Sequence, residues 1–188
     1  MKGFINVDKY YTEKDLKEKK GYFQTSTFTK KDKFVQADLI QLPFPENYAD
    51  YILCLDCIEH IPLREVVPAL QEIYRVLKPT CKLSMTTCDF TGAALEWIKM
   101  MMYGNFDIKA YMNQAEVIYG HQSAEGEYHI SPMTPQFLNY ALTGVGFKNV
   151  IINYHPKGGK PPRVAPSKRF VSKDAVLRND VLVVEATK

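Results

Sequence analysis

The sequence lacks a long hydrophobic run, and its 188 residues carry a formal net charge of only +3. No apolar stretch is long enough to span a bilayer, and the first residues lack the charged-then-apolar pattern of a signal peptide. So small a net charge does not indicate nucleic acid as a partner. We therefore expect a cytoplasmic protein that acts neither in a membrane nor on nucleic acid.

Cysteine is scarce as well, with four in the chain: Cys54, Cys57, Cys81 and Cys88. Cys54 and Cys57 form a C-x-x-C, but they fall on or beside an expected strand, and no second close pair accompanies them. Buried thiols are the favoured interpretation, so neither a metal site nor a redox pair is expected. Cys57 can still line a pocket.

What is present suits one globular domain over residues 1–188, because 46% of the residues are hydrophobic and a chain of this length can bury a core. One segment differs. Residues 155–173 hold four prolines and six lysines or arginines without an apolar period, which predicts an exposed basic loop between the last two strands. A solvated surface is the favoured interpretation of this loop, and attraction of an acidic or phosphate-bearing partner is the alternative.

The stretch from Phe34 to Leu83 orders strand, acidic turn, strand and helix. Residues 33–36 and 50–55 are short runs rich in aromatic and branched side chains, which predicts two buried strands. An amphipathic helix follows, because apolar residues recur at three- and four-residue steps. These residues are Leu63, Val66, Val67, Leu70, Ile73, Tyr74 and Leu77. The unit is typical of a Rossmann-like α/β sheet with helices on both faces.

The limits of this helix follow from its prolines. A start near Arg64 or Glu65 places Pro68 in the first turn, where backbone N–H groups have no acceptor within the helix. Pro79 ends the helix, and residues 81–86 then form the next strand, which makes the last three elements a crossover.

For the remaining segments, the sequence predicts the type of element but little of its role. Residues 91–104 form an unusually apolar helix, for which core packing is favoured over a lid above the site. Residues 134–142 predict a helix and residues 147–154 a strand, whereas residues 12–33 read as a surface helix and loop.

Two acids follow expected strands. Asp8 ends the strand at residues 3–8, and Asp38 directly follows the next strand. In open parallel sheets ligands lie beyond the carboxyl ends of strands, where a carboxylate can accept both hydrogen bonds of a ribose diol. Asp38 could accept from an adenine amino group, and the apolar Leu39 could cover the ring. Either acid alone is more often a turn former, but together they favour a nucleotide site.

These residues resemble a known family. FINVD, ADLIQLPFPENYADYILCLDCIEHI and LQEIYRVLKPTCKL are similar to motifs of the class I S-adenosylmethionine-dependent methyltransferases, especially their small-molecule, type 11-like branch. The resemblance implies that Asp8 holds the ribose hydroxyls, that Asp38 binds the adenine amine, and that residues 54–60, including Asp56 and Cys57, line the cofactor and acceptor pocket. S-adenosylmethionine is therefore the expected cofactor.

The acceptor side is less defined. Asp56 is the expected contact for the acceptor or the methionine end of the cofactor, with helix capping as the alternative. His129, in a loop near Ser131, is the candidate catalytic residue, although loop histidines are often only solvated. His60 belongs to a Glu-His pair that matches a family motif, and capping of the next helix is its alternative.

The chain departs from the family in lacking a glycine-rich loop ahead of Asp8, where the family places its first and central strand. Three explanations stay open: an incomplete gene product, a gap filled by another chain or by rearrangement, or a degenerate methyltransferase. A second departure is Thr80-Cys81 in place of two glycines, so that turn forms without their freedom at positive φ.

The function expected from these patterns is methyl transfer from S-adenosylmethionine to an unidentified acceptor, with a small molecule as one candidate. The alternative is an inactive, methyltransferase-like binding or scaffolding protein, or a truncated product. An oligomer or a partner that completes the sheet is compatible with either hypothesis.

Overall fold

A computed structural model describes residues 4–18, 33–104, 107–154 and 181–188. The elements in chain order are β1 (Ile5–Asp8), α1 (Glu13–Glu18), β2 (Lys33–Gln36), β3 (Ala49–Leu55), η2 (Ile58–His60), α2 (Leu63–Val76), β4 (Leu77–Cys88), α3 (Phe90–Tyr103), α4 (Ile108–Tyr119), α5 (Pro135–Val145), β5 (Lys148–Tyr154) and β6 (Val181–Thr187). The predicted basic loop at residues 155–173 and most of the predicted helix and loop at 12–33 lie outside the described residues.

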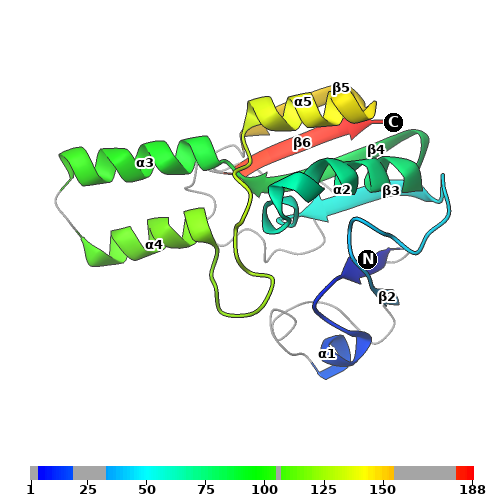
Figure 1. Ribbon diagram of the computed structural model, residues 1–188, viewed down its shortest axis with the longest axis horizontal. Helices are drawn as coiled ribbons and strands as arrows, with labels where there is room; N and C mark the ends of the chain where they lie inside the picture. The colour runs from blue at the N-terminus through cyan, green and yellow to red at the C-terminus, as the bar shows by residue number, and fades with distance from the viewer. Residues whose placement is uncertain (1–3, 19–32, 105–106, 155–180) are drawn as a thin grey trace.

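The described strands form two sheets rather than one. The larger has the order β3-β4-β6-β5, in which β3 and β4 are parallel and β6 is antiparallel to both of its neighbours. The smaller pairs β1 with β2 in parallel and lies beside the β3 edge of the larger sheet (Figure 1). The predicted mixed α/β class is therefore confirmed, whereas the arrangement of the strands is only partly Rossmann-like.

The division falls where the resemblance implies a central strand. Among the described strands, β1 is hydrogen-bonded only to β2, and β3 only to β4. The two sheets nevertheless touch: the ring of Phe4, just before β1, lies edge-on to that of Tyr51 on β3, with 6.4 Å between centroids. Strands β1 and β3 are therefore neighbours without being paired.

Helix α2 makes the predicted crossover between the parallel strands β3 and β4. Its start differs from the prediction: it begins at Leu63, so Pro68 lies in the second turn rather than in the first. Proline has no N–H to donate to the carbonyl of Arg64, four residues earlier. Both residues are exposed, so water can reach that carbonyl and the helix continues.

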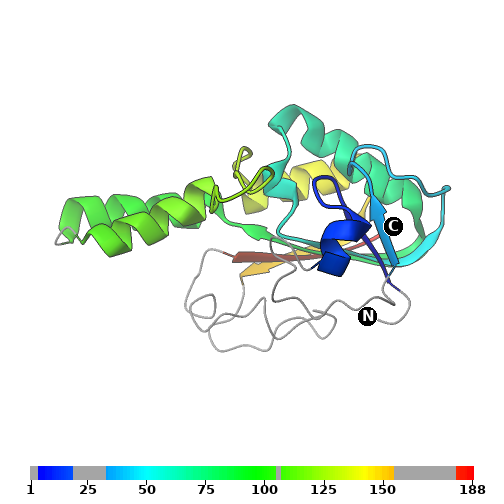
Figure 2. The ribbon, with the colours of Figure 1, turned by 90° about the horizontal axis from the view of Figure 1, so that it is seen from below.

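The core lies between the larger sheet and the helices α2 and α5, which lie on the same side of it (Figure 2). Tyr74 of α2 meets Phe147 edge-on at 5.0 Å, and Gly146 lets the chain turn there with a φ of 117°. Helices on both faces were expected. In the part of the chain that the structure describes, the helices packed on the sheet cover one face.

Helices α3 and α4 form a hairpin that projects away from the sheet (Figures 1 and 2). Trp97 holds the two helices together through edge contacts with Tyr111 at 5.2 Å and Tyr119 at 6.1 Å. The prediction that the helix at 91–104 packs in the core is wrong, because most of its apolar side chains are exposed. These include Leu95, Ile98, Met101, Met102 and Tyr103. Helix α4 was not predicted.

The turn within β4 forms without glycine, as expected. Thr80 adopts a φ of 65°, which is unusual for a β-branched residue, and its N–H donates to the carbonyl of Lys188 at 3.1 Å. None of the helices in the described ranges is both long and apolar enough to cross a bilayer.

Candidate functional site

The acids predicted to hold a nucleoside lie on adjacent strand ends. Asp8 is the last residue of β1, and its carbonyl accepts the N–H of Ala37, one residue before Asp38, at 2.9 Å. The Asp8 carboxylate also accepts the N–H groups of Tyr10 at 2.8 Å and Tyr11 at 3.0 Å. The structure therefore brings Asp8 and Asp38 to one edge of the small sheet, and Asp8 additionally forms the turn after β1.

Asp38 has a basic neighbour that the sequence analysis did not consider. The ammonium of Lys9 lies 2.6 Å from the Asp38 carboxylate, and the N–H of Ile40 donates to it at 3.3 Å. Partial burial opposes ionisation of Asp38, but the bonds from Lys9 and Ile40 outweigh it, so the pKa of Asp38 lies below its ordinary value. A ligand amine that binds Asp38 must compete with Lys9.

Two further residues of the expected cofactor pocket are partly buried. Leu39, directly after Asp38, is half-buried and packs against the hydrophobic core. Cys57, just before η2, does the same. None of the four cysteines, all of which the structure describes, is in a disulfide.

Asp56 sits where β3 ends, with a left-handed φ of 43°. Its N–H donates to the Thr86 carbonyl on β4 at 3.0 Å, and the Thr86 hydroxyl donates to its carboxylate at 2.9 Å. The side chain is exposed at the carboxyl end of the larger sheet. Since η2 has Cys57 as its N-cap residue, with no side-chain hydrogen bond, the capping alternative for Asp56 is not seen.

A loop from the far end of the chain closes over η2. The N–H groups of Ile130 and Ser131 donate to the Glu59 carbonyl at 2.9 and 3.1 Å, and the Ser131 hydroxyl donates to the carbonyl of Ile61. His60 contributes its Nδ1, which lies 3.0 Å from the carbonyl of Tyr128. His60 thus holds this loop and does not cap α2, whose N-cap residue is Pro62.

His129 is placed by this loop at the carboxyl end of β4. Its Nδ1 lies 3.0 Å from the carbonyl of Val117 and 3.7 Å from Sγ of Cys88, and its ring meets that of His60 at 4.8 Å. Burial, followed by the nearby charge of His60, lowers the pKa of His129 to about 4. At neutral pH the imidazole is therefore uncharged and can accept a hydrogen bond, but it is a weak base.

Glu59 is the residue that the sequence analysis missed. It is 1% exposed, and its Oε1 accepts the Cys88 N–H at 3.3 Å, while Oε2 is buried without a hydrogen-bond partner. Burial, together with the charge of Asp56, raises the pKa of Glu59 to about 8. The Glu59-His60 pair was the sequence signal for this residue, but the sequence analysis assigned a role only to His60.

A contact between Tyr10 and Gly126 connects the strand end that carries Asp8 with the loop that carries His129. Tyr10 follows the Asp8 strand end, and its ring lies against Gly126 in the loop that leads to His129: a Cβ built on Gly126 would be 2.3 Å from that ring. Gly126 has a φ of 87°, which an L side chain rarely adopts. The carboxyl end of β1 and the His129 loop therefore border the same region.

This arrangement defines an α/β protein with acidic side chains at the carboxyl ends of parallel strands, and comparisons with known proteins specify the family. Residues 6–85 match the family described as Methyltransferase domain. A sterol 24-C-methyltransferase from Pneumocystis carinii (strain B80) is 32% identical over 144 residues, covering 77% of this chain and 31% of that protein. The chain spans less than a third of the length of the first curated relatives that it matches.

Solved structures agree with this match. An S-adenosylmethionine-dependent methyltransferase from Archaeoglobus fulgidus has a TM-score of 0.56 at 16% identity, covering 98% of this chain and 75% of that one. A chain from the complex between the Haloferax volcanii Trm112 methyltransferase activator and a methyltransferase has a TM-score of 0.53 at 13% identity, covering 98% and 82%. At such identities the likeness shows the fold alone.

Residues 6–85 therefore match the methyltransferase domain family, and the resemblance to class I S-adenosylmethionine-dependent methyltransferases is confirmed for this segment. The matched segment contains Asp8, Asp38, Asp56 and Cys57, whereas His129 lies beyond it.

Proposed function

We propose that the chain binds S-adenosylmethionine and transfers its methyl group to an acceptor held near His129. The observation that carries the proposal is the placement of Asp8 and Asp38 on neighbouring strand ends within the segment that matches the methyltransferase family. Carboxylates accept hydrogen bonds only, so two acids side by side suit a ligand that presents several donors, such as a ribose diol and an adenine amine.

The acids fit the adenosine half of the cofactor under one condition. Asp8 ends β1 and can receive the ribose hydroxyls, while Asp38 can receive the adenine amine once Lys9 turns away from it. The Lys9 side chain is 51% exposed, so its ion pair with Asp38 contributes little and can be exchanged for a ligand contact.

When bound, the cofactor supplies a methyl group on a positively charged sulfur, which is reactive by itself. The protein must align the acceptor, exclude water and take up a proton where the acceptor loses one. His129 is uncharged at neutral pH and can accept a hydrogen bond from the acceptor, although its lowered pKa makes it a weak base, and Asp56 projects from the carboxyl end of β3 as a contact for the acceptor or for the methionine end of the cofactor.

A second function is favoured by the divided sheet. The edges of β1 and β3 that lie toward each other have no hydrogen-bonded strand among the described residues, and a backbone strand that joins them would satisfy both. The chain would then act as a binding protein whose sheet a partner completes. The Haloferax structure, a complex with an activator, is one instance of a partnered protein of this fold.

Calorimetric titration with S-adenosylhomocysteine separates the two functions. We expect saturable 1:1 binding that weakens about tenfold or more in Asp8→Asn and in Asp38→Asn, because each loses a charge-assisted hydrogen bond. Asp50→Asn is the matched control, since the Asp50 side chain is 83% exposed and pairs with Lys78. The methyltransferase proposal is wrong for this chain if no heat is observed, or if all three variants bind like the parent.

The acceptor is identified by a screen with labelled S-adenosylmethionine. Small molecules are the first class to test, and label that appears in a product with the parent but not with Asp8→Asn marks the acceptor. The sterol-acting relative is matched over less than a third of its own length, so sterols enter this screen as one class among several.

A further inference from the structure

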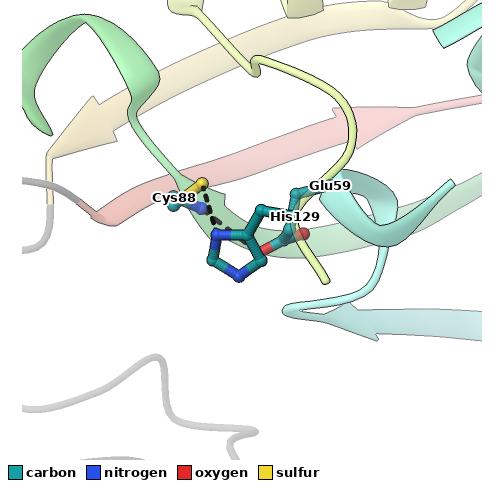
Figure 3. A group of neighbouring side chains, drawn as sticks. All are labelled: Glu59, Cys88 and His129. Atoms are coloured by element: carbon teal, nitrogen blue, oxygen red, sulfur yellow. Dashed lines mark hydrogen bonds between the residues drawn. The ribbon is translucent and has the colours of Figure 1, made fainter. Parts of the chain in front are cut away.

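Three potential metal ligands from distant parts of the chain lie close together where the loop that carries His129 meets η2 and the end of β4. Glu59 comes from η2, Cys88 from the end of β4 and His129 from the loop between α4 and α5. Figure 3 shows the three side chains converging, and their ligand atoms all lie within 4.8 Å of one another. Each belongs to a different segment, so the fold rather than local sequence brings them together.

We propose that Glu59, Cys88 and His129 form a binding site for a divalent zinc ion. A thiolate, an imidazole and a carboxylate are the ligands that zinc takes in proteins, and a mixed set of this kind is poorly suited to magnesium or calcium, which prefer oxygen. Three protein ligands leave a fourth position of a tetrahedral ion open to water or to another group. The inference does not depend on the proposed methyl transfer.

The spacing of the ligands suits a tetrahedral ion. Zinc lies about 2.0–2.3 Å from nitrogen, oxygen and sulfur, which separates neighbouring tetrahedral ligands by about 3.3–3.8 Å. Sγ of Cys88 and Nδ1 of His129 are 3.7 Å apart, within that range. The upper limit of 4.8 Å for the whole group requires only a small inward movement of side chains.

The buried carboxylate provides a second, independent observation. Glu59 is 1% exposed, and its Oε2 has no hydrogen-bond partner, although burial of an unpaired polar atom is unfavourable. Within the described ranges Glu59 forms no ion pair with a basic side chain, and its charged neighbour Asp56 has the same sign. The hydroxyl of Thr87, next to Cys88, is buried close enough to Glu59 to act against the rise in the pKa of its carboxyl, although no hydrogen bond of good geometry joins the two side chains. A cation between these groups would satisfy the carboxylate.

Metal binding would change what holds His129. In the structure Nδ1 lies 3.0 Å from the Val117 carbonyl on α4, and a carbonyl only accepts, so Nδ1 carries the proton of this bond. Coordination through Nδ1 therefore replaces the bond to α4 with a bond to the metal. The result would tie the loop to β4 and η2, next to the contacts that Ile130 and Ser131 already make with the Glu59 carbonyl.

Cobalt substitution tests the site directly in the full chain. Protein freed of metal with a chelator is titrated with Co²⁺, and we expect one equivalent to produce thiolate-to-cobalt absorption together with the visible bands of a tetrahedral ion. One equivalent of Zn²⁺ should then abolish both signals. Weak octahedral bands, or no thiolate absorption at saturating Co²⁺, would overturn the proposal.

Variants assign the ligands. Zinc affinity, measured by calorimetry, should fall at least tenfold in Cys88→Ser, His129→Gln and Glu59→Gln. Cys81→Ser and His121→Gln are the matched controls, because Cys81 lies seven residues before Cys88 in β4 and the His121 side chain is 76% exposed. Circular dichroism checks that each variant is folded. If a variant is unfolded, the cobalt spectrum of the unmodified protein still tests whether the site binds metal. Equal affinity in ligand and control variants would show that the metal binds elsewhere.

Discussion

Lys9 is the side chain that most directly affects the proposed nucleoside site. Its ammonium lies 2.6 Å from the Asp38 carboxylate, in the place where an amine of a ligand would bind. An exposed ion pair of this kind contributes up to about 1 kcal/mol, so the competition that it offers is modest but measurable.

We expect Lys9→Met, which keeps the apolar stem but removes the charge, to raise the affinity for S-adenosylhomocysteine up to about fivefold. Calorimetry measures the change. Lys14→Met is the control, since Lys14 is 77% exposed and pairs within α1 with Glu18. A loss of affinity in Lys9→Met would instead show that Lys9 itself contacts the ligand.

Glu72 on α2 provides a test of pH dependence. Its carboxylate accepts from Arg75 and from the N–H of Leu42, both at 2.7 Å; the bond from Arg75, which outweighs the opposing effect of burial, lowers the pKa of Glu72. The folded-state pKa lies below the unfolded one, so this contribution to stability is present above the unfolded pKa of Glu72 and is lost as the pH falls through the folded one.

Glu72→Gln should therefore reduce the free energy of unfolding at pH 7 by about 1 kcal/mol, and the difference from the parent should shrink between about pH 6 and pH 3. Urea denaturation at several pH values measures this. Glu96→Gln removes a pair of similar spacing that is 62% exposed at both residues, and should change little. If the difference between Glu72→Gln and the parent grows as the pH falls, the pKa of Glu72 is not lowered by folding.

At the residue scale, the sequence predicted that Asp8 and Asp38 lie at one edge of a sheet, because each stands at or just after a strand end and parallel strands end at a common edge. That the two acids bind a nucleoside stays a prediction. Sequence reasoning missed Glu59, Cys88 and His129 as a group because no short spacing connects them. Only the path of the loop over η2 brings them together, and that path depends on backbone hydrogen bonds that carry no sequence pattern.

At the scale of elements, the segment that matters most is the loop between α4 and α5. It contacts the β1 side of the molecule through Gly126 and Tyr10, and it reaches η2 through Ile130 and Ser131. The loop therefore connects the small sheet to the carboxyl ends of the larger one, and its position decides whether the two halves of the proposed site can act on one ligand.

Gly126→Ala should lower the free energy of unfolding by about 1–2 kcal/mol, because its φ of 87° is unfavourable for alanine and the added Cβ meets the Tyr10 ring. Gly144→Ala is the matched control: this glycine lies in α5, with nothing within 4 Å of an added Cβ, so the change should stabilise the protein by about 0.5–1 kcal/mol. Thermal and urea unfolding measure both. Equal effects at the two positions would contradict the placement of Tyr10 against the loop.

Sequence patterns predicted α2, whose apolar face packs on the larger sheet, and they predicted the bounds of the short strand β2. The α3–α4 hairpin was not predicted because its pattern does not distinguish a buried helix from one that projects with apolar side chains exposed. Pro68 was misplaced because a proline on an exposed face is tolerated beyond the first turn.

At the scale of the whole molecule, the proposed site requires that both sheets contact the same ligand. Strands β1 and β2 carry the proposed adenosine contacts, while β3, η2 and the His129 loop carry the acceptor side. Because β1 and β3 are not paired in the described chain, no strand pairing there joins the small sheet to the larger one, although the ring of Phe4 contacts that of Tyr51. We therefore expect its backbone amides to exchange with solvent sooner than those of β4 and β6.

Amide hydrogen exchange with and without saturating S-adenosylhomocysteine tests most directly whether one ligand occupies both halves of this site. The account predicts slower exchange on ligand binding in residues 5–12, 36–40 and 56–61 together, with the α3–α4 hairpin unchanged. Protection confined to one of the two sheets, or protection absent from all three segments, would contradict it.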